Sequence, residues 1–188
     1  MTTRLQSGDA LVIVDLQKDF CAGGSLQVPD GDSVVAVLND WIATARDANV
    51  PIIASRDWHP LEHCSFDALG GPWPEHCVQD SEGAEFHDDL ELPASTVLVS
   101  KGCAFDRDAY SAFDGTGLES FLRRRGVQRL WIGGLAEDVC VLQTVLDACT
   151  KGFDTYLIPE ATRPVDPASR PRIEAEMRDA GAKLAGSI

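Results

Sequence analysis

Residues 10–15 read ALVIVD, a continuous apolar run that ends at an aspartate. Alternating apolar and polar residues indicate a strand with one wet face, whereas an unbroken run of this length predicts a strand buried on both faces. Similar runs follow at 51–55 (PIIAS), 95–99 (STVLV), 128–132 (QRLWI) and 154–158 (DTYLI). Such segments are typical of the strands of a parallel sheet that is covered on both sides.

Segments with helical spacing lie between these apolar runs. Apolar residues recur at intervals of three and four in 33–49 and 139–150, 118–125 is expected to be a shorter helix, and 168–180 is expected to be the last one. The closing residues can add a final strand. This alternation predicts an α/β fold, with a doubly wound, mainly parallel sheet that carries helices on both faces.

Length and charge limit the functions open to the chain. Its 188 residues fit one domain, 1–188, with an irregular segment at about 57–92. Lysine and arginine number 16 against 30 acidic residues, a net charge of −14. So acidic a chain is repelled by nucleic acids and by anionic membranes, and we expect neither as a partner. The chain has no apolar run of about 20 residues and no secretory signal pattern, so we expect a cytoplasmic protein.

The six cysteines form no C-x-x-C pair, and in a reducing compartment we expect mostly free thiols, with three disulfides as the alternative. Cys140 follows a predicted strand and is expected in the first turn of a helix. Unpaired N–H groups and the helix dipole stabilise a thiolate there and could hold an oxyanion beside the sulfur. A buried core thiol fits this position equally well, and Cys149 is expected to be one.

Three polar residues end predicted strands: Asp15, Asp57 and Lys101. Because parallel sheets bind ligands at the carboxyl ends of their strands, we expect these residues and Cys140 to cluster. Asp15 could take the thiol proton and pass it to a leaving group, and Lys101 could lower the pKa of the thiol. Taken alone, Asp15 is better explained as a loop-capping carboxylate and Lys101 as a surface lysine.

The segment 57–92 is long, irregular and rich in glycine, proline and acidic residues, which is usual for functional segments in compact domains. The four histidines of the chain, at positions 59, 63, 76 and 87, all lie in it. Asp57, His59 and a further histidine suit zinc, iron or manganese. Solvated surface histidines are the alternative, and His63 and His87 are expected at the surface rather than as ligands.

Two aromatic residues, Phe20 and Trp73, lie in loops beside these candidates. Most such residues serve packing. A flat aromatic substrate would also need aromatic walls of this kind.

Longer motifs connect these residues. In chain order they are ALVIVDLQKDFCAGGSL (10–26), SRDWHPLEHCSF (55–66), GPWPEHCVQ (71–79), GAEFH (83–87), SKG (100–102) and GGLAEDVCVLQT (133–144). In their order and spacing the chain resembles the nicotinamidases of the isochorismatase-like (cysteine hydrolase) superfamily, and the resemblance covers nearly the whole chain. The pairing of DWHP with WPEHCVQ is the specific part, because it separates metal-bearing nicotinamidases from metal-free relatives.

The resemblance implies a catalytic triad of Asp15, Lys101 and Cys140 on a doubly wound α/β fold. It also implies an oxyanion hole built from the N–H groups of Ala136 and Cys140. A cis peptide bond is expected just before the first of these donors, between Leu135 and Ala136.

The resemblance further implies a divalent metal, with zinc favoured over iron or manganese. Its ligands would be Asp57, His59 and His76, with waters completing the shell. Ser65 matches a position that in some members contacts the metal directly or through water. Phe20 and Trp73 match the aromatic residues that sandwich a pyridine ring.

The implied activity is hydrolysis of nicotinamide to nicotinate and ammonia through a Cys140 thioester, with the metal on the pyridine nitrogen and pyrazinamide as a further substrate. Another amide or ureide hydrolase of the superfamily is the first alternative, and a non-catalytic metal-binding or redox-sensing protein the second. The chain departs from the family pattern at Lys18, at 80–81 and at 137–139. Of these positions, Val139 is expected to alter the pocket and therefore the range of substrates. The sequence leaves open NAD salvage against a catabolic role, and a monomer against a homo-oligomer.

Overall fold

The structure is a computed structural model that describes residues 4–186 and 188. In this part of the chain six strands form one sheet, in the order β3-β2-β1-β4-β5-β6, with every neighbouring pair parallel. The strands are β1 (Asp9–Val14), β2 (Ile52–Asp57), β3 (Val97–Lys101), β4 (Arg129–Leu135), β5 (Asp154–Arg163) and β6 (Lys183–Leu184). The predicted parallel sheet, including the final short strand, is confirmed.

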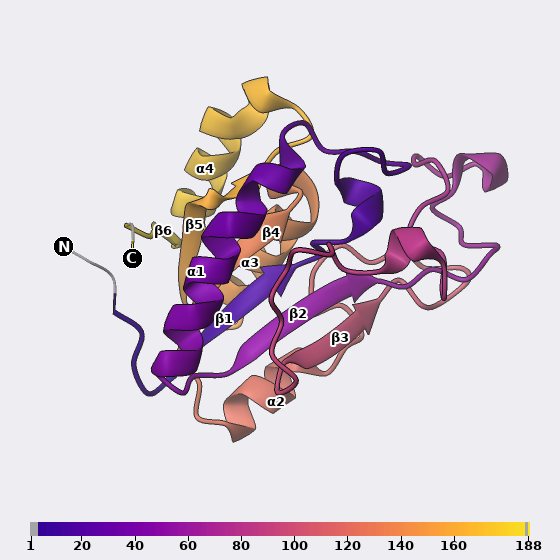
Figure 1. Cartoon of the computed structure of the whole chain (residues 1–188). Helices are drawn as coiled ribbons and strands as arrows, with labels where there is room; N and C mark the ends of the chain where they lie inside the picture. Colours follow the sequence, from indigo (N-terminus) through magenta and orange to yellow (C-terminus); the bar gives the residue numbers. More distant parts are fainter. Residues whose placement is uncertain (1–3, 187) are drawn as a thin grey trace.

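Helices cover both faces of this sheet, as the doubly wound prediction requires (Figure 1). The helices are α1 (Val34–Asp47), α2 (Leu118–Arg124), α3 (Leu142–Thr150) and α4 (Arg170–Asp179). In β1, Leu11 and Ile13 pack in the apolar cluster that contains α1. Val12 and Val14 pack in the cluster that contains the other three helices. Because successive side chains of a strand point to opposite faces, both sets must be apolar, which explains the unbroken run.

The ends of several strands differ from the sequence-based expectation. The strand expected to stop at residue 132 continues through Gly133 and Gly134 to Leu135. A Cβ atom at Gly134 would lie 2.0 Å from the carbonyl oxygen of Val14. These glycines therefore permit close strand packing rather than end the strand. Likewise β3 extends to Lys101, because it pairs with β2 as far as Asp57.

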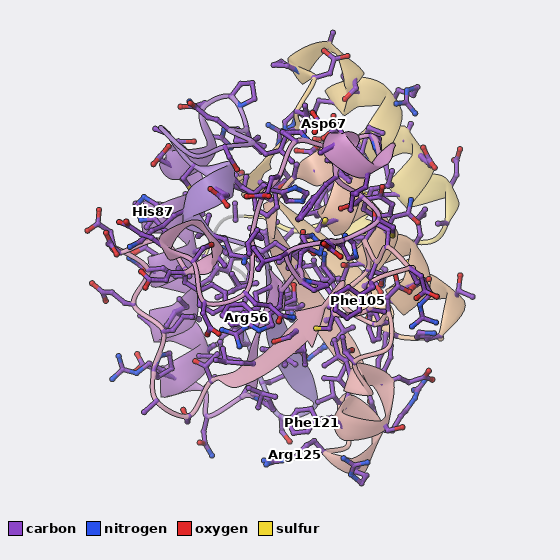
Figure 2. The ribbon with its side chains drawn as sticks, turned by 90° about the vertical axis from the view of Figure 1, so that its right-hand side faces the viewer. Arg56, Asp67, His87, Phe105, Phe121 and Arg125 are labelled. Carbon is purple, nitrogen blue, oxygen red and sulfur yellow. The ribbon has the colours of Figure 1, made fainter. Side chains whose placement is uncertain are left out.

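The strand order places the candidate residues at a switch point of the sheet. From β1 the chain continues to β2 on one side, whereas β4 pairs with β1 on the other. Ligands of open α/β sheets bind at such a point, outside the carboxyl ends of the strands. Most of the segment 57–92, with two short 3-10 turns at Asp67–Leu69 and Glu82–Ala84, lies over this end, and its last residues run back toward the start of β3 (Figure 1). Figure 2 looks onto this end and shows Asp67 and His87 of that segment well apart.

None of the helices in the described part of the chain has the length and apolar character needed to cross a membrane.

Candidate active site

Three buried side chains from three different strand ends meet at the carboxyl end of the sheet. Lys101 Nζ lies 2.8 Å from Asp15 Oδ2 and donates to Cys140 Sγ at 3.4 Å. Their exposed fractions are 0% for Asp15, 1% for Lys101 and 6% for Cys140. Asp57 Oδ1 lies 2.5 Å from Lys101 Nζ, so the structure brings together all four residues expected to cluster, and a surface position for Lys101 is excluded.

Asp15 is held in an unusual backbone conformation directly after β1. Its φ is +45°, a region that aspartate tolerates better than most residues do. The Ser55 hydroxyl donates to Asp15 Oδ1 at 2.7 Å, and the Asp15 N–H donates to the Ser55 carbonyl at 3.1 Å. Sequence reasoning missed Ser55. Its only signal was a hydroxyl at the end of an apolar run.

The setting of Cys140 corrects one expectation. The thiol lies in a short π-helical turn, Glu137–Val141, that precedes α3, and not in the first turn of an α-helix. Burial raises the pKa of the Cys140 thiol well above its usual value, Lys101 opposes this shift, and Asp15 and Asp57 add to it. The resting group is therefore a thiol that needs a base, and not a preformed thiolate.

The neighbouring groups respond to the same burial. Burial raises the pKa of the Asp15 carboxyl, and Lys101 only partly opposes the shift. Burial alone would lower the pKa of the Lys101 ammonium, but Asp15 and Asp57 raise it well above its usual value. For Asp57, burial is outweighed by Lys101 and then by His59, which hold its pKa well below the usual range. The site thus pairs a charged lysine with a charged Asp57 and leaves Asp15 the more basic carboxylate.

Asp57, His59 and His76 form a buried set of groups suited to a metal ion. One ligand atom from each lies within 4.8 Å of the others. His59 Nδ1 donates to the Gly102 carbonyl at 2.9 Å, and His76 Nδ1 donates to the Pro74 carbonyl at 2.7 Å. In each neutral ring the Nε2 atom therefore carries the lone pair, and the two Nε2 atoms lie 3.7 and 4.0 Å from Asp57 Oδ2. Fixing the tautomer through the other ring nitrogen is the usual arrangement of metal-bound histidine.

Two residues that sequence reasoning did not single out hold this set in place. Gly102 has a φ of +62°, and a Cβ there would lie 2.4 Å from His59 Cε1. Gln17 accepts from the Asp57 N–H at 2.8 Å and donates to the Asp57 carbonyl at 2.8 Å. Gly102 lies in the motif SKG (100–102) and Gln17 in the motif at 10–26, but neither residue type pointed to its partner.

His63 is fully buried, so its expected surface position was wrong. The segment 57–92 folds back and stacks this ring on His59, with ring centroids 4.1 Å apart. His63 Nε2 donates to the Arg107 carbonyl at 3.3 Å, and His63 Nδ1 accepts from the Ser65 hydroxyl at 2.7 Å. The Ser65 hydroxyl is therefore bonded to this histidine, and its contact with a metal through water stays a prediction.

His87 is half-buried rather than at the surface and lies in a second group with Cys21 and Asp32, whose ligand atoms lie within 4.8 Å of one another. His87 Nδ1 accepts from the Asp89 N–H at 3.1 Å, and His87 Nε2 lies 3.1 Å from Asp32 Oδ1. Both nitrogens of the ring are thus in use within the protein. Asp32 also accepts from the Ala22 N–H at 2.9 Å, so this group ties loops together.

One cavity is lined both by the buried thiol and by the set of groups suited to a metal ion. Cys140 and Ala136 contribute to its wall, as do the Asp57, His59 and His76 set and the aromatic rings of Phe20 and Trp73. Trp73 Nε1 donates to Tyr110 Oη at 3.1 Å. Tyr110 also lines the cavity and was missed, because nothing in its local sequence distinguishes it. The Leu135–Ala136 peptide bond is cis, as the resemblance implied.

The six cysteines are free thiols, which confirms the expectation for a chain without disulfides. Cys149 was expected to be a core thiol, but it is only half-buried. It lies in α3 beyond the turn that carries Cys140. The two thiols therefore differ both in burial and in their neighbours.

The fold and this arrangement define a class: parallel α/β enzymes with a buried cysteine, carboxylate and lysine beside a cluster of metal-binding type. The model of the isochorismatase domain matches residues 9–187. The chain is 40% identical to the nicotinamidase of Escherichia coli (strain K12) over 93% of each chain. The pyrazinamidase of Pyrococcus horikoshii, solved in complex with zinc, superposes with a TM-score of 0.92 at 43% identity, covering 95% of this chain and 98% of that one. A protein of L. infantum, solved in complex with nicotinate, superposes with a TM-score of 0.90 at 38% identity, covering 98% of this chain and 96% of that one. The chain belongs to the isochorismatase family.

Proposed function

We propose that this chain is an amidohydrolase that converts nicotinamide to nicotinate and ammonia, with Cys140 as its nucleophile. The observation that carries this proposal is the single cavity lined by the Cys140 thiol, by two aromatic rings and by the buried Asp57, His59 and His76 set. Such a cavity suits a flat ring that bears both an amide and a nitrogen lone pair. The similarity to nicotinamidases supports the same substrate.

Acylation begins when Asp15 accepts the Cys140 proton and the sulfur attacks the amide carbon. The carbon–sulfur bond forms as the carbonyl electrons move to oxygen, and the N–H groups of Ala136 and Cys140 donate to this oxyanion. The carbon–nitrogen bond then breaks. Asp15 returns its proton to the departing nitrogen, which leaves as ammonia, and the acyl group stays on sulfur as a thioester.

Deacylation uses the same residues in reverse. Asp15 takes a proton from water, whose oxygen attacks the thioester carbon. The carbon–sulfur bond then breaks, the sulfur takes the proton back from Asp15 as the thiol re-forms, and the carboxylic acid product loses its proton to solvent as nicotinate. The raised pKa of Asp15 makes this carboxylate a stronger base than an exposed aspartate. Lys101, 3.4 Å from the sulfur, offsets the negative charge as it develops.

Asp57, His59 and His76 would hold a divalent metal, and we propose zinc, with iron or manganese as alternatives. The fixed Nε2 lone pairs of both histidines fit such an ion. When bound, the metal supplies a Lewis acid for the pyridine nitrogen, at a distance from the bond that breaks. Phe20 and Trp73 hold the two faces of the ring, which extends the proposed substrates to pyrazinamide.

An assay of ammonia release tests this proposal. Zinc-loaded protein is given nicotinamide, a small aliphatic amide and a linear ureide in parallel, and we expect kcat/KM to favour nicotinamide by about 10³-fold or more. Equal or better turnover of the ureide would assign the chain to another activity of the family. No ammonia from any substrate would favour a non-catalytic metal-binding or redox role.

A further inference from the structure

Glu137 is a buried carboxyl group that the reaction does not use. It lies between Ala136 and Cys140 in chain order, at the start of the π-helical turn. Its side chain is 0% exposed, and neither carboxyl oxygen has a hydrogen-bond partner. Arg170 Nε lies 3.4 Å from Glu137 Oε2 as an ion pair. A buried charge with so little compensation is costly, so its place in this turn needs an explanation.

Arg170 connects this carboxyl group to two other elements. Its Nε also donates to Glu174 Oε1 at 3.1 Å within α4, and a terminal guanidinium nitrogen donates to the Pro159 carbonyl of β5. When Glu137 is neutral, Arg170 keeps these two partners. The attraction between Glu137 and Arg170 is therefore the part of this arrangement that a proton can switch.

The next residue, Asp138, anchors the same turn from its other side. Its carboxylate accepts from the N–H groups of Val165 and Asp166 at 2.8 and 3.0 Å, and from the Ser169 hydroxyl at 3.2 Å. Val165 lines the cavity. Two adjacent acids thus fasten the turn, Asp138 to the β5–α4 connection through hydrogen bonds and Glu137 to the first residue of α4 through charge alone.

We propose that Glu137 is a positioning residue: its ion pair with Arg170 holds the turn that presents Ala136 and Cys140. Protonation of Glu137 loosens that turn. The turn must align with Asp15 and Lys101, which come from other strands, so loosening lowers the reactivity of the thiol. The consequence for catalysis rests on the proposed function, whereas the consequence for the thiol does not. Binding of the substrate's ring depends on other segments, so KM should change little.

The charges around Glu137 place this switch near neutrality. Burial raises the pKa of Glu137 to about 7, Arg170 opposes the shift, Glu174 and Asp138 add to it, and Arg163 opposes it. The native carboxyl group therefore keeps its proton above the usual value of 4.5. Arg170 offsets only part of the cost of burial, so the ionised Glu137 orients the turn at a net cost in folding free energy, and this contribution to stability is full below pH 4.5 and is lost as the pH rises through about 7.

The first experiment measures alkylation of Cys140 by iodoacetamide in the zinc-loaded protein, followed by peptide mass spectrometry. Exposed Cys103 is the internal reference. In the wild type, the alkylation rate of Cys140 divided by that of Cys103 should change in a step as the pH is varied. The midpoint of this step should lie near pH 7, because burial raises the pKa of Glu137 to about 7. Glu137→Gln, Arg170→Gln and the double variant should all lose that step and resemble one another, because loss of either partner breaks the pair.

Arg172→Gln is the matched control, because Arg172 pairs with Glu176 on the exposed side of the same helix at 3.4 Å. It should keep the wild-type step. For nicotinamide at pH 8, kcat of Glu137→Gln should fall about tenfold while KM stays within about twofold. The melting temperature of the wild type should also fall relative to Glu137→Gln between pH 5 and pH 8.

An unchanged pH step and kcat in Glu137→Gln would overturn the proposal, as would an equal effect of Arg172→Gln. A failure of the proposed function looks different: the wild type would release no ammonia from nicotinamide, yet alkylation of Cys140 would still separate the variants.

Discussion

Lys101 Nζ donates to Asp57 Oδ1 at 2.5 Å, and the two residues are register partners at the ends of β3 and β2. The other oxygen of the same carboxylate, Asp57 Oδ2, faces His59 and His76. Lys101 therefore contacts both the Cys140 thiol and Asp57, one of the proposed metal ligands. The sequence placed Asp57 and Lys101 together at the strand ends, and the structure shows that one carboxylate, that of Asp57, joins the thiol site to the histidines.

Lys101→Met should destabilise the metal-free protein strongly. It leaves the carboxylates of Asp15 and Asp57 buried without their shared cation, a change that costs about 3–5 kcal/mol. Lys183→Met is the control, because Lys183 pairs with Asp154 at 2.6 Å in an exposed position, where solvent screening leaves an ion pair little effect on stability. Urea unfolding in the presence of a chelator measures both, and similar losses would contradict this role for Lys101.

Two variants should distinguish the proton acceptor, Asp15, from the proposed metal ligands. His76→Ala should remove most of the bound metal and raise KM for nicotinamide, because one of three ligands is gone. Asp15→Asn should keep its metal and lose about 10³-fold in kcat, since the proton acceptor is missing. Metal content and steady-state kinetics distinguish them, and loss of metal from Asp15→Asn would mean that the two groups are assigned wrongly.

Gly102→Ala should weaken metal binding through His59. Its added Cβ would meet His59 Cε1 at 2.4 Å and turn the ring, and disturbing such supporting contacts costs about 10–100-fold in metal affinity. Gly152→Ala shares the positive φ, +78°, but its Cβ would meet nothing within 4 Å. A competitive chelator titration compares the two variants. Equal affinities would contradict the support that Gly102 gives to His59.

Substrates should divide by the ring nitrogen rather than by shape. Pyrazinamide keeps a nitrogen at the equivalent place and should be hydrolysed. Benzamide has the same outline but presents a C–H group, and sites built to pair a polar atom reject such analogues by about 10⁴-fold. Benzamide turnover within about tenfold of nicotinamide would instead indicate that Phe20 and Trp73 alone select the ring.

The fold was predictable because burial on both sheet faces leaves a direct trace in the sequence. Residues 10–14 of β1 are all buried, as their apolar run predicted, and the structure adds buried Asp9 at the start of the strand. Strand ends were less predictable, because Gly133 and Gly134 resemble a turn unless the close approach of Val14 is known. Local sequence carries no information about such a neighbour.

The part of the candidate site that lies at the carboxyl ends of the strands was predictable, because these ends meet at one edge of a parallel sheet. That rule brought Asp15, Lys101 and Cys140 together, while their chemical roles stay predictions. Partners such as Ser55 and Gln17 were missed, because a polar residue type at or just after a strand end does not indicate which group it binds. His63 and Glu137 were missed for the opposite reason: residue types usually found at the surface are buried here by distant segments.

The central claim is that Cys140, and no other thiol, carries the acyl group. The most direct measurement is turnover of nicotinamide by zinc-loaded Cys140→Ala beside Cys149→Ala, with metal content and melting temperature confirming that both are folded. Cys149→Ala should stay within about twofold of the wild type, whereas Cys140→Ala should lose about 10⁴-fold or more in kcat, because no other nucleophile replaces the sulfur. Comparable turnover by the two variants would contradict the account.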